Sequence, residues 1–154
     1  MPADKELSPE EKAAAAERNF LSGCNCCQSV LLAFADELGQ DADTLMRLGS
    51  PFGGGIGRLR ETCGTVTGML MVYGWLRGYT DQADKPAHYE RVRALVKKFT
   101  DKNGSIVCRE LLAGVKTTAG GAPEARTPAY YKKRPCGRYC ADAARIVTEA
   151  LRKQ

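Results

Sequence analysis

The sequence predicts an all-α protein: a single small bundle of about six to seven helices, with a glycine-rich loop before its central helix. Three observations lead to this prediction. Apolar residues recur at helical spacing in successive segments, and capping residues and glycines mark the segment ends. In addition, no stretch alternates apolar and polar residues as a half-buried strand would.

The predicted helices fall into seven segments that are separated by these boundary signals. Their approximate ranges are 9–20, 26–38, 43–48, 62–76, 85–102, 106–112 and 136–152. The 154 residues suit one domain with a buried core. We divide the chain into an N-terminal helical extension, residues 1–20, and a four-cysteine helical domain, residues 21–154.

Ser8 and Asn25 are the predicted N-caps of the first two helices. Ser8 is followed by Pro9 and, three residues after the cap, by Glu11, an arrangement typical of a helix start. The apolar stripe of the first helix is thin, so we expect this helix to pack loosely or to serve in an oligomer contact, such as a homodimer. Behind Asn25, apolar residues follow helical spacing up to Gly39.

The central helix begins after a glycine-rich loop. Four of the five residues 53–57 are glycine, which permits turns that other residues avoid. The helix over 62–76 is apolar nearly all round, so we expect it to be the buried axis of the domain. Gly64 and Gly68 lie four residues apart on it and would allow another helix to approach closely.

The last three helices have their own start signals. Pro86, Ser105 and Pro135 stand at the three predicted N-termini. Residues 114–134 contain several glycines and prolines and no apolar periodicity. We predict a mobile loop there, because long connections without structure are uncommon in compact domains and are usually functional or mobile.

Composition and charge limit the kinds of partner. The net charge is +5, and the basic segment Arg126–Arg138 holds five basic residues with no acidic residue. This segment is either a solvated loop or the docking surface of an acidic redox partner protein. Motifs of nucleic-acid binding are missing, and so is any apolar run of about 18 residues that could span a membrane.

Cysteine usage points to metal or thiol chemistry. The N-terminus lacks the features of a secretory signal, so we expect a cytoplasmic protein, in which thiols stay reduced. Seven cysteines is an odd and high number for such a protein, and this count argues against a pure disulfide framework. The single histidine, His88, rules out a multi-histidine metal site within one chain.

Four of the cysteines lie at predicted helix N-termini. They are Cys26, Cys63, Cys108 and Cys136. Backbone N–H groups and the helix dipole stabilise thiolates and anionic clusters at such positions. If the four helix ends converge, they form a pocket for a four-thiolate metal centre or for thiol–disulfide exchange. Cys24, Cys27 and Cys140 are more simply explained by packing.

Cys63 combines the most influences that favour a thiolate. It precedes the most apolar helix, and Arg58 and Arg60 lie just upstream. Backbone N–H groups of the glycine-rich loop can point at the Cys63 sulfur, and Gly54, Gly55 and Gly64 are the candidate cofactor-binding residues. We therefore expect Cys63 to have the lowest pKa of the seven thiols in the metal-free protein, although burial acts in the opposite direction.

Several segments together resemble the C-GCAxxG-C-C family, whose members are described as redox-active proteins. The matching features, in order, are Asn25-Cys26, Ser50-Pro51-Phe52-Gly53-Gly54-Gly55, Cys63-Gly64-Thr65-Val66-Thr67-Gly68, Cys108-Arg109-Glu110-Leu111-Leu112 and Cys136. The resemblance implies a small helical redox domain in which Cys26, Cys63, Cys108 and Cys136 are the four characteristic cysteines. It also implies an association with iron–sulfur binding and electron transfer, without identifying a reaction. The chain has Thr65 where the family motif has alanine.

Three functions stay open at this level. In the first, the four cysteines hold an iron–sulfur cluster. In the second, no metal is bound: Cys63 attacks a disulfide, one of the other three cysteines resolves it, and Cys63 and Cys26 are the redox thiols. In the third, the chain is a structural zinc site or a helical interaction module.

Overall fold

The computed structural model describes residues 6–153, and it is 67 % helical with no strand among those residues. The described part contains nine α-helices, six of them with at least seven residues. Their bounds are α1 Pro9–Leu21, α2 Cys26–Ala33, α3 Ala35–Leu38, α4 Ala42–Gly49, α5 Gly64–Arg77, α6 Lys85–Asn103, α7 Cys108–Leu111, α8 Pro128–Lys133 and α9 Cys136–Arg152. Among the described residues, no helix has both the length and the apolarity of a membrane span.

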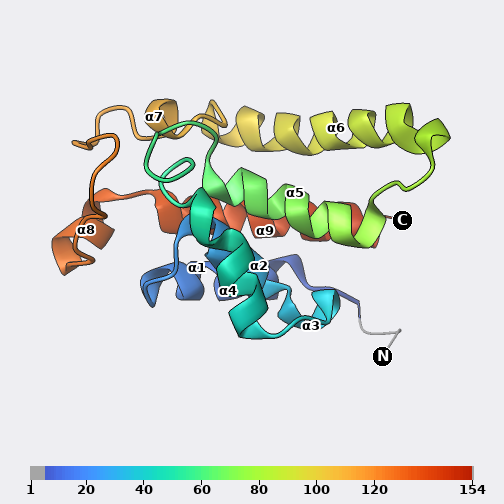
Figure 1. The fold of residues 1–154 in the computed structure, drawn as a ribbon, viewed down its shortest axis with the longest axis horizontal. Helices are drawn as coiled ribbons and strands as arrows, with labels where there is room; N and C mark the ends of the chain where they lie inside the picture. Colours follow the sequence, from blue (N-terminus) through green and yellow to red (C-terminus); the bar gives the residue numbers. More distant parts are fainter. Residues whose placement is uncertain (1–5, 154) are drawn as a thin grey trace.

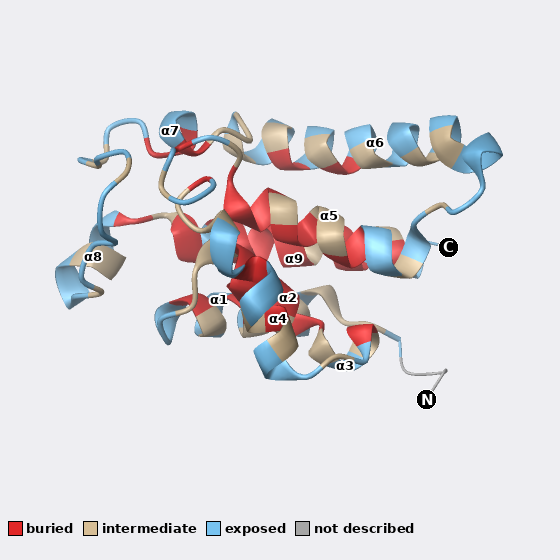
Figure 2. Cartoon of the chain, viewed as in Figure 1, coloured by how far each residue is buried: buried red, intermediate tan, exposed pale blue. Residues whose placement is uncertain are grey.

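Four helices form the centre of the bundle (Figure 1). α2 packs against α1, α5 and α9, and α9 in turn packs against α1, α5 and α6. Burial is concentrated on α2, α5 and α9, whereas α6 lies at the edge with its outer face exposed (Figure 2). The largest fully buried side chains include Tyr73, Phe20 and Phe34, which come from α5, α1 and the end of α2.

The predicted N-caps of the first two helices are present. The Ser8 side chain accepts a hydrogen bond from the backbone N–H of Glu11. Asn25 and Gln28 form a reciprocal capping box at the start of α2. Because a capping interaction contributes about 1 kcal/mol, these residues fix where both helices begin.

The helix count differs from the prediction at two places. The helix expected over 26–38 is split, because Phe34 adopts a non-helical conformation between α2 and α3. α8 lies inside the segment 114–134, where we predicted no structure. Thr127 caps this short helix and Pro128 occupies its first position, so a start signal was present.

The first helix packs more tightly than predicted. Its small residues Ala13 and Ala16 are buried, and they allow α1 to lie closely against its neighbours. Phe20, at the end of the helix, is 1 % exposed and belongs to the main hydrophobic cluster. A thin apolar stripe is therefore sufficient to hold α1 in the bundle, because its small residues permit close contact with the neighbouring helices. The division of the chain near residue 20 stays a prediction.

Gly64 and Gly68 allow α5 to approach α2, as their spacing predicted. A Cβ atom on Gly64 would lie 2.7 Å from the Phe52 carbonyl oxygen and 3.1 Å from the Cys27 backbone nitrogen. A Cβ atom on Gly68 would lie 3.1 Å from the Cys27 carbonyl oxygen. The backbones of the two helices are thus in direct contact at these positions.

Gly64→Ala and Gly74→Ala should have opposite effects on stability. At Gly64 the added methyl group meets backbone atoms that cannot move independently, and we expect a loss of about 1–3 kcal/mol in the free energy of unfolding. At Gly74, on the same helix, nothing lies within 4 Å, so alanine should stabilise by about 0.5–1 kcal/mol. Urea denaturation measures both values. Equal effects would show that the α2–α5 contact is looser than described.

Candidate functional site

The four predicted cysteines all lie at helix N-termini. Cys26, Cys108 and Cys136 are the first residues of α2, α7 and α9. α5 begins two residues later than predicted, so Cys63 is its N-cap, and the Cys63 side chain caps no backbone N–H. Each helix therefore begins with a short thiol side chain at or next to its positive end.

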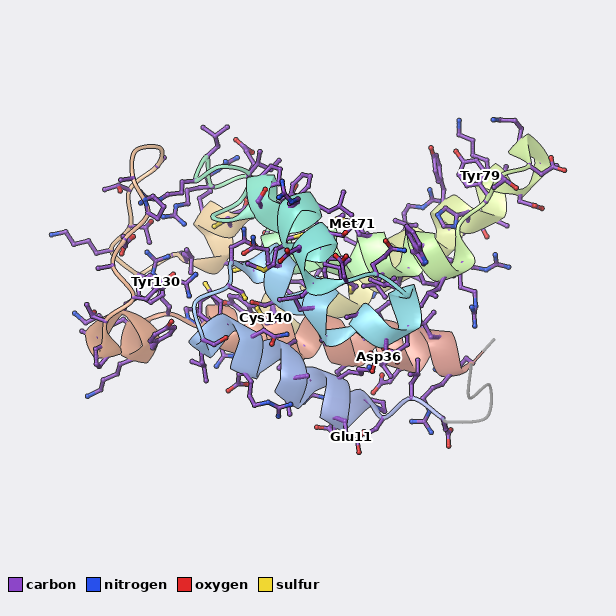
Figure 3. All side chains as sticks on the ribbon, turned by 60° about the horizontal axis from the view of Figure 1, so that its bottom comes forward. Glu11, Asp36, Met71, Tyr79, Tyr130 and Cys140 are labelled. Carbon is purple, nitrogen blue, oxygen red and sulfur yellow. The ribbon has the colours of Figure 1, made fainter. Side chains whose placement is uncertain are left out.

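One cavity of about 50 Å³ brings these cysteines together. Its lining includes all four cysteines and the three glycines nominated from the sequence, Gly54, Gly55 and Gly64. In Figure 3, sulfur atoms gather around Cys140, at the end of the bundle where Tyr130 also lies. The convergence that the cysteine placement suggested is thus present in the fold; metal binding and redox roles for these residues stay predictions.

The other three cysteines do not line this cavity. Cys24 is half-buried beside Met46, and Cys27 is buried with its sulfur 3.8 Å from that of Met71. Cys140 is buried behind Cys26, with its sulfur 3.9 Å from the Cys26 carbonyl oxygen. These positions agree with the packing roles expected from the sequence.

The glycine-rich loop shapes one wall of the cavity. Residues 54–58 all have positive φ, and Ile56 and Arg58 are not glycines. Such a conformation costs roughly 1–2 kcal/mol for each non-glycine residue. Gly55 is required for a second reason: a Cβ atom there would lie 2.7 Å from the Cβ of Cys108 and 2.8 Å from the backbone nitrogen of Glu61.

A short backbone pairing holds Cys63 beside Cys108. The backbone N–H of Cys63 donates to the carbonyl of Ile106, and that of Cys108 donates to the carbonyl of Glu61. Thr62 and Val107 form an isolated antiparallel bridge between the two segments. This pairing was not predicted, because a single bridge has no alternating pattern of apolar and polar residues.

Three arginines also line the cavity. A guanidinium nitrogen of Arg60 lies 3.8 Å from the sulfur of Cys108. Arg126 donates to the carbonyls of Phe20 and Cys24 and lies 4.4 Å from the centre of the Phe20 ring. Arg134 is buried and forms an ion pair with Glu124. The sequence analysis identified these positive charges, but no sequence pattern indicated that Arg126 and Arg134 would line the cavity.

The segment 114–134 is anchored over the cavity by hydrogen bonds to two arginines. Arg58 donates to the carbonyl oxygens of Thr118 and Ala122, and the backbone N–H of Gly120 donates to the Arg58 carbonyl. Arg126 holds the far part of the segment against the end of α1. The partners of these arginines are distant in the sequence, so local composition did not indicate the anchors; the mobility of the segment stays a prediction.

Burial controls the pKa of the cavity thiols. It raises the pKa of Cys63 to about 11, although a hydrogen bond with the Thr65 hydroxyl acts in the opposite direction. The prediction that Cys63 has the lowest pKa is therefore wrong: Cys63 is buried, and loss of hydration exceeds the effect of the helix N-terminus. Burial also raises the pKa of Cys108, against the effect of Arg60.

Cys26 and Cys136 form a coupled pair. A hydrogen bond between their side chains and burial together hold the pKa of Cys136 well above its ordinary value. The same hydrogen bond lowers the pKa of Cys26, but a hydrogen bond with Cys140 and burial outweigh it. All four cavity thiols are thus protonated near neutral pH, and a positive charge brought into the cavity would displace their protons.

The cavity suits sulfur-ligated groups in its donor type. Four thiols are the usual ligands of iron–sulfur clusters and of structural zinc. Within residues 6–153, however, no three metal-ligating side chains stand close enough to hold a single ion as they are. The donor set of the described residues therefore suits a metal centre by its chemistry and not by its present arrangement.

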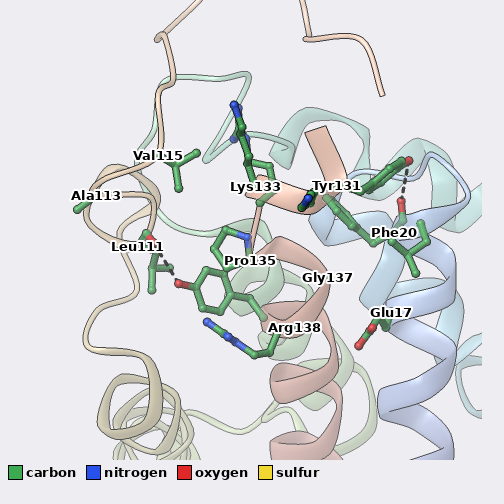
Figure 4. Close-up of a pocket in the computed structure, with 14 residues that line it drawn as sticks. Glu17, Phe20, Leu111, Ala113, Val115, Tyr131, Lys133, Pro135, Gly137 and Arg138 are labelled. Atoms are coloured by element: carbon green, nitrogen blue, oxygen red, sulfur yellow. Dashed lines mark hydrogen bonds between the residues drawn. The ribbon is translucent and has the colours of Figure 1, made fainter. Parts of the chain in front are cut away.

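A larger cavity of about 550 Å³ shares Arg134 with the cysteine cavity (Figure 4). It shares Phe20, Leu111 and Tyr139 with the cysteine cavity, and the Tyr139 hydroxyl donates to the Leu111 carbonyl. Its exposed basic residues are Lys132, Lys133 and Arg138. The basic segment is therefore divided: two of its arginines face the cysteine cavity, and the other three basic residues face solvent.

The stability of the reduced, metal-free protein should fall between pH 9 and pH 11. The folded pKa of Cys63, about 11, lies above the ordinary value of 9.0. In this interval the unfolded chain binds fewer protons at this group, so rising pH favours unfolding by up to about 1.4 kcal/mol per pH unit. Urea unfolding at pH 8.5 and pH 10.5 measures the loss.

The matched variants are Cys63→Ser and Cys24→Ser. Removal of the Cys63 thiol should flatten the pH dependence, whereas removal of the half-buried Cys24 thiol should change it much less. If wild type and Cys63→Ser lost stability in parallel, titration of Cys63 would not be responsible.

Comparison with known proteins adds a family to this geometry. A family model described as "Putative redox-active protein (C_GCAxxG_C_C)" matches residues 24–150. Comparison with curated proteins and with solved structures gave no match. The matched region contains all four cavity cysteines and the glycine-rich loop. This chain, with four cysteines at helix N-termini around one buried cavity, belongs to the C_GCAxxG_C_C family of redox-active proteins.

Proposed function

We propose that this protein transfers electrons by means of an iron–sulfur cluster held by Cys26, Cys63, Cys108 and Cys136. The observation that carries the proposal is the convergence of these four cysteines, each from a different helix, on one buried cavity. When bound, such a cluster would supply one-electron redox chemistry at a potential that its surroundings tune.

The residues around the cysteines suit an anionic group. Thiolate ligation places negative charge in the cavity, and Arg60, Arg126 and Arg134 supply compensating positive charge. Arg60 is 6 % exposed and Arg134 is 9 % exposed, so water screens their charges little. Buried guanidinium groups of this kind would favour deprotonation of the thiols once a metal is present.

The lining is not preformed for zinc. A single zinc ion at about 2.3 Å from each sulfur requires the four sulfurs to lie about 3.8 Å apart. No three ligating side chains of residues 6–153 meet such a requirement. In a four-iron cluster each thiolate binds a different iron, so a cluster of this kind requires less crowded sulfurs than zinc does.

Entry of a cluster requires a change in the lining. The cavity volume of about 50 Å³ is comparable to that of one or two water molecules. The segment 114–134 supplies Arg126, Tyr130 and Arg134 to the lining, and its one helix, α8, is short. We propose that this segment moves outward when the cluster is inserted.

The mutual influence of two cavity cysteines supports thiol–disulfide chemistry as a second candidate. Cys26 and Cys136 both line the cavity, and each is the largest single influence on the pKa of the other. Oxidation of this pair would form one S–S bond and release two protons and two electrons, and a disulfide of a partner molecule would accept them and become two thiols. This pairing differs from the sequence-based alternative, in which Cys63 attacks first.

The exposed basic residues Lys132, Lys133 and Arg138 are the proposed contact for an acidic redox partner protein. They lie next to Cys136 in the chain and line the cavity shown in Figure 4. Complementary charge at such a position would speed association more than it would strengthen binding.

Metal and acid-labile sulfide analysis of anaerobically prepared protein tests the leading proposal. Replacement of Cys26, Cys63, Cys108 or Cys136 by serine should in each case remove most of the bound iron and sulfide. Cys24→Ser is the matched control, because Cys24 is half-buried and lies outside the cavity. Equal loss in Cys24→Ser and Cys26→Ser would contradict the residue assignment.

The same anaerobic preparations distinguish thiol–disulfide chemistry from the iron–sulfur proposal. If the protein holds neither iron nor sulfide, mild oxidation followed by peptide mapping should give a Cys26–Cys136 disulfide. A protein that contains neither a metal nor a reversible disulfide among the four cysteines would contradict both candidates.

A further inference from the structure

A third cavity, of about 310 Å³, opens beside the cysteine cavity. The two cavities share Asn25, Gly54, Arg60, Arg126, Tyr130 and Arg134 in their linings. We call this third cavity the arginine vestibule, because its lining also includes Arg58 and therefore four guanidinium groups. A molecule in the vestibule would lie directly against the wall of the cysteine cavity.

Positive charge in the vestibule exceeds negative charge. Glu124 is the one acidic residue in the lining, opposite four arginines. Its carboxylate lies 3.6 Å from Arg58 and 3.8 Å from Arg60, and it forms a closer ion pair with Arg134. Three guanidinium groups thus share a single carboxylate.

The cations are buried more deeply than their counter-ion. The side chains of Arg58, Arg60 and Arg134 are 12 %, 8 % and 4 % exposed, whereas that of Glu124 is 38 % exposed. Removal of a charge from water is unfavourable unless it is paired. The vestibule therefore retains a net attraction for a further anion, and Glu124 is the group that can most easily move toward solvent.

The backbone that presents two of these arginines is strained. Arg58 and Arg60 have φ values of +65° and +60°. Residues held in this way persist only where the surrounding structure enforces them, and they cluster at binding and catalytic sites. Here the strained backbone directs two guanidinium groups toward the same carboxylate.

We propose that the arginine vestibule binds the anionic group of a small ligand, a carboxylate or a tetrahedral oxyanion, in the position that the Glu124 carboxylate occupies. Guanidinium groups match both kinds of anion through paired N–H donors. The shared lining places the remainder of such a ligand against the cysteine cavity. This site goes beyond the proposed redox function, and its binding test requires neither a metal nor an oxidised thiol.

Isothermal titration calorimetry of the reduced, metal-free protein at low ionic strength tests the proposal. The probes are sulfate, for a free oxyanion, and succinate, for an organic carboxylate. Glu124→Gln removes the competing carboxylate and should raise the affinity for at least one probe by about tenfold. Arg58→Gln should lower that affinity by about tenfold or more, because it removes a charged donor.

Two exposed substitutions separate local binding from net charge. Glu149→Gln changes the net charge by the same amount as Glu124→Gln, and Arg93→Gln by the same amount as Arg58→Gln. Glu149 and Arg93 are exposed and lie outside the vestibule. Neither control should alter the affinity appreciably. A gain in Glu124→Gln cannot result from misfolding, so this variant keeps the test informative even if Arg58→Gln disturbs the anchored segment.

The outcomes are distinct. Binding of sulfate alone would assign the site to free oxyanions, and stronger binding of succinate would assign it to organic carboxylates. If neither wild type nor Glu124→Gln bound either probe, or if Glu124→Gln and Glu149→Gln behaved alike, the proposal would be overturned. A lack of iron and sulfide would leave anion binding unaffected, so failure of one proposal does not imply failure of the other.

Discussion

The site depends on close contacts between backbone segments at glycine positions, where no Cβ atom keeps the segments apart. Gly64 places the start of α5 against α2, and Gly55 places the glycine-rich loop against Cys108. A Cβ atom at Gly64 would push the start of α5 away from the start of α2, and one at Gly55 would push the loop away from Cys108. The cavity is therefore formed by the absence of side chains as much as by the cysteines that line it.

Two electrostatic effects oppose each other inside this cavity. Helix N-termini and arginines favour thiolates, whereas burial favours neutral thiols. Burial is the larger effect for Cys63, which has a raised pKa despite its position at the start of α5. The metal-free protein thus holds protonated thiols beside guanidinium groups that share the single carboxylate of Glu124. Both proposed functions of this region follow from that imbalance of charge.

The sequence was sufficient for the local features and for the identity of the converging cysteines. Capping residues such as Ser8 and Asn25 act within a few positions of themselves, so their effects can be predicted from the sequence. The four cysteines at helix N-termini could be singled out from the sequence, because cysteines placed by chance would be scattered through helix interiors.

Features that depend on distant partners were not predictable. The anchored segment 114–134 is held by Arg58, whose partners lie some 60 positions away in the chain. The inward placement of Arg134 depends on its ion pair with Glu124. The pKa of Cys63 depends on how much water the assembled fold excludes, which no local pattern records. In each case the deciding interaction exists only after the helices have packed.

The run of positive φ values in the glycine-rich loop has a stereochemical consequence. At Gly57, where φ is +50°, nothing lies within 4 Å of a would-be Cβ atom, so space does not restrict this position. An L-residue there is disfavoured by its chirality alone, at a cost of roughly 1–2 kcal/mol. A D-amino acid prefers this conformation and would also restrict the unfolded chain. The best residue for this position is therefore one that the ribosome does not supply, and glycine is the closest that the genetic code offers.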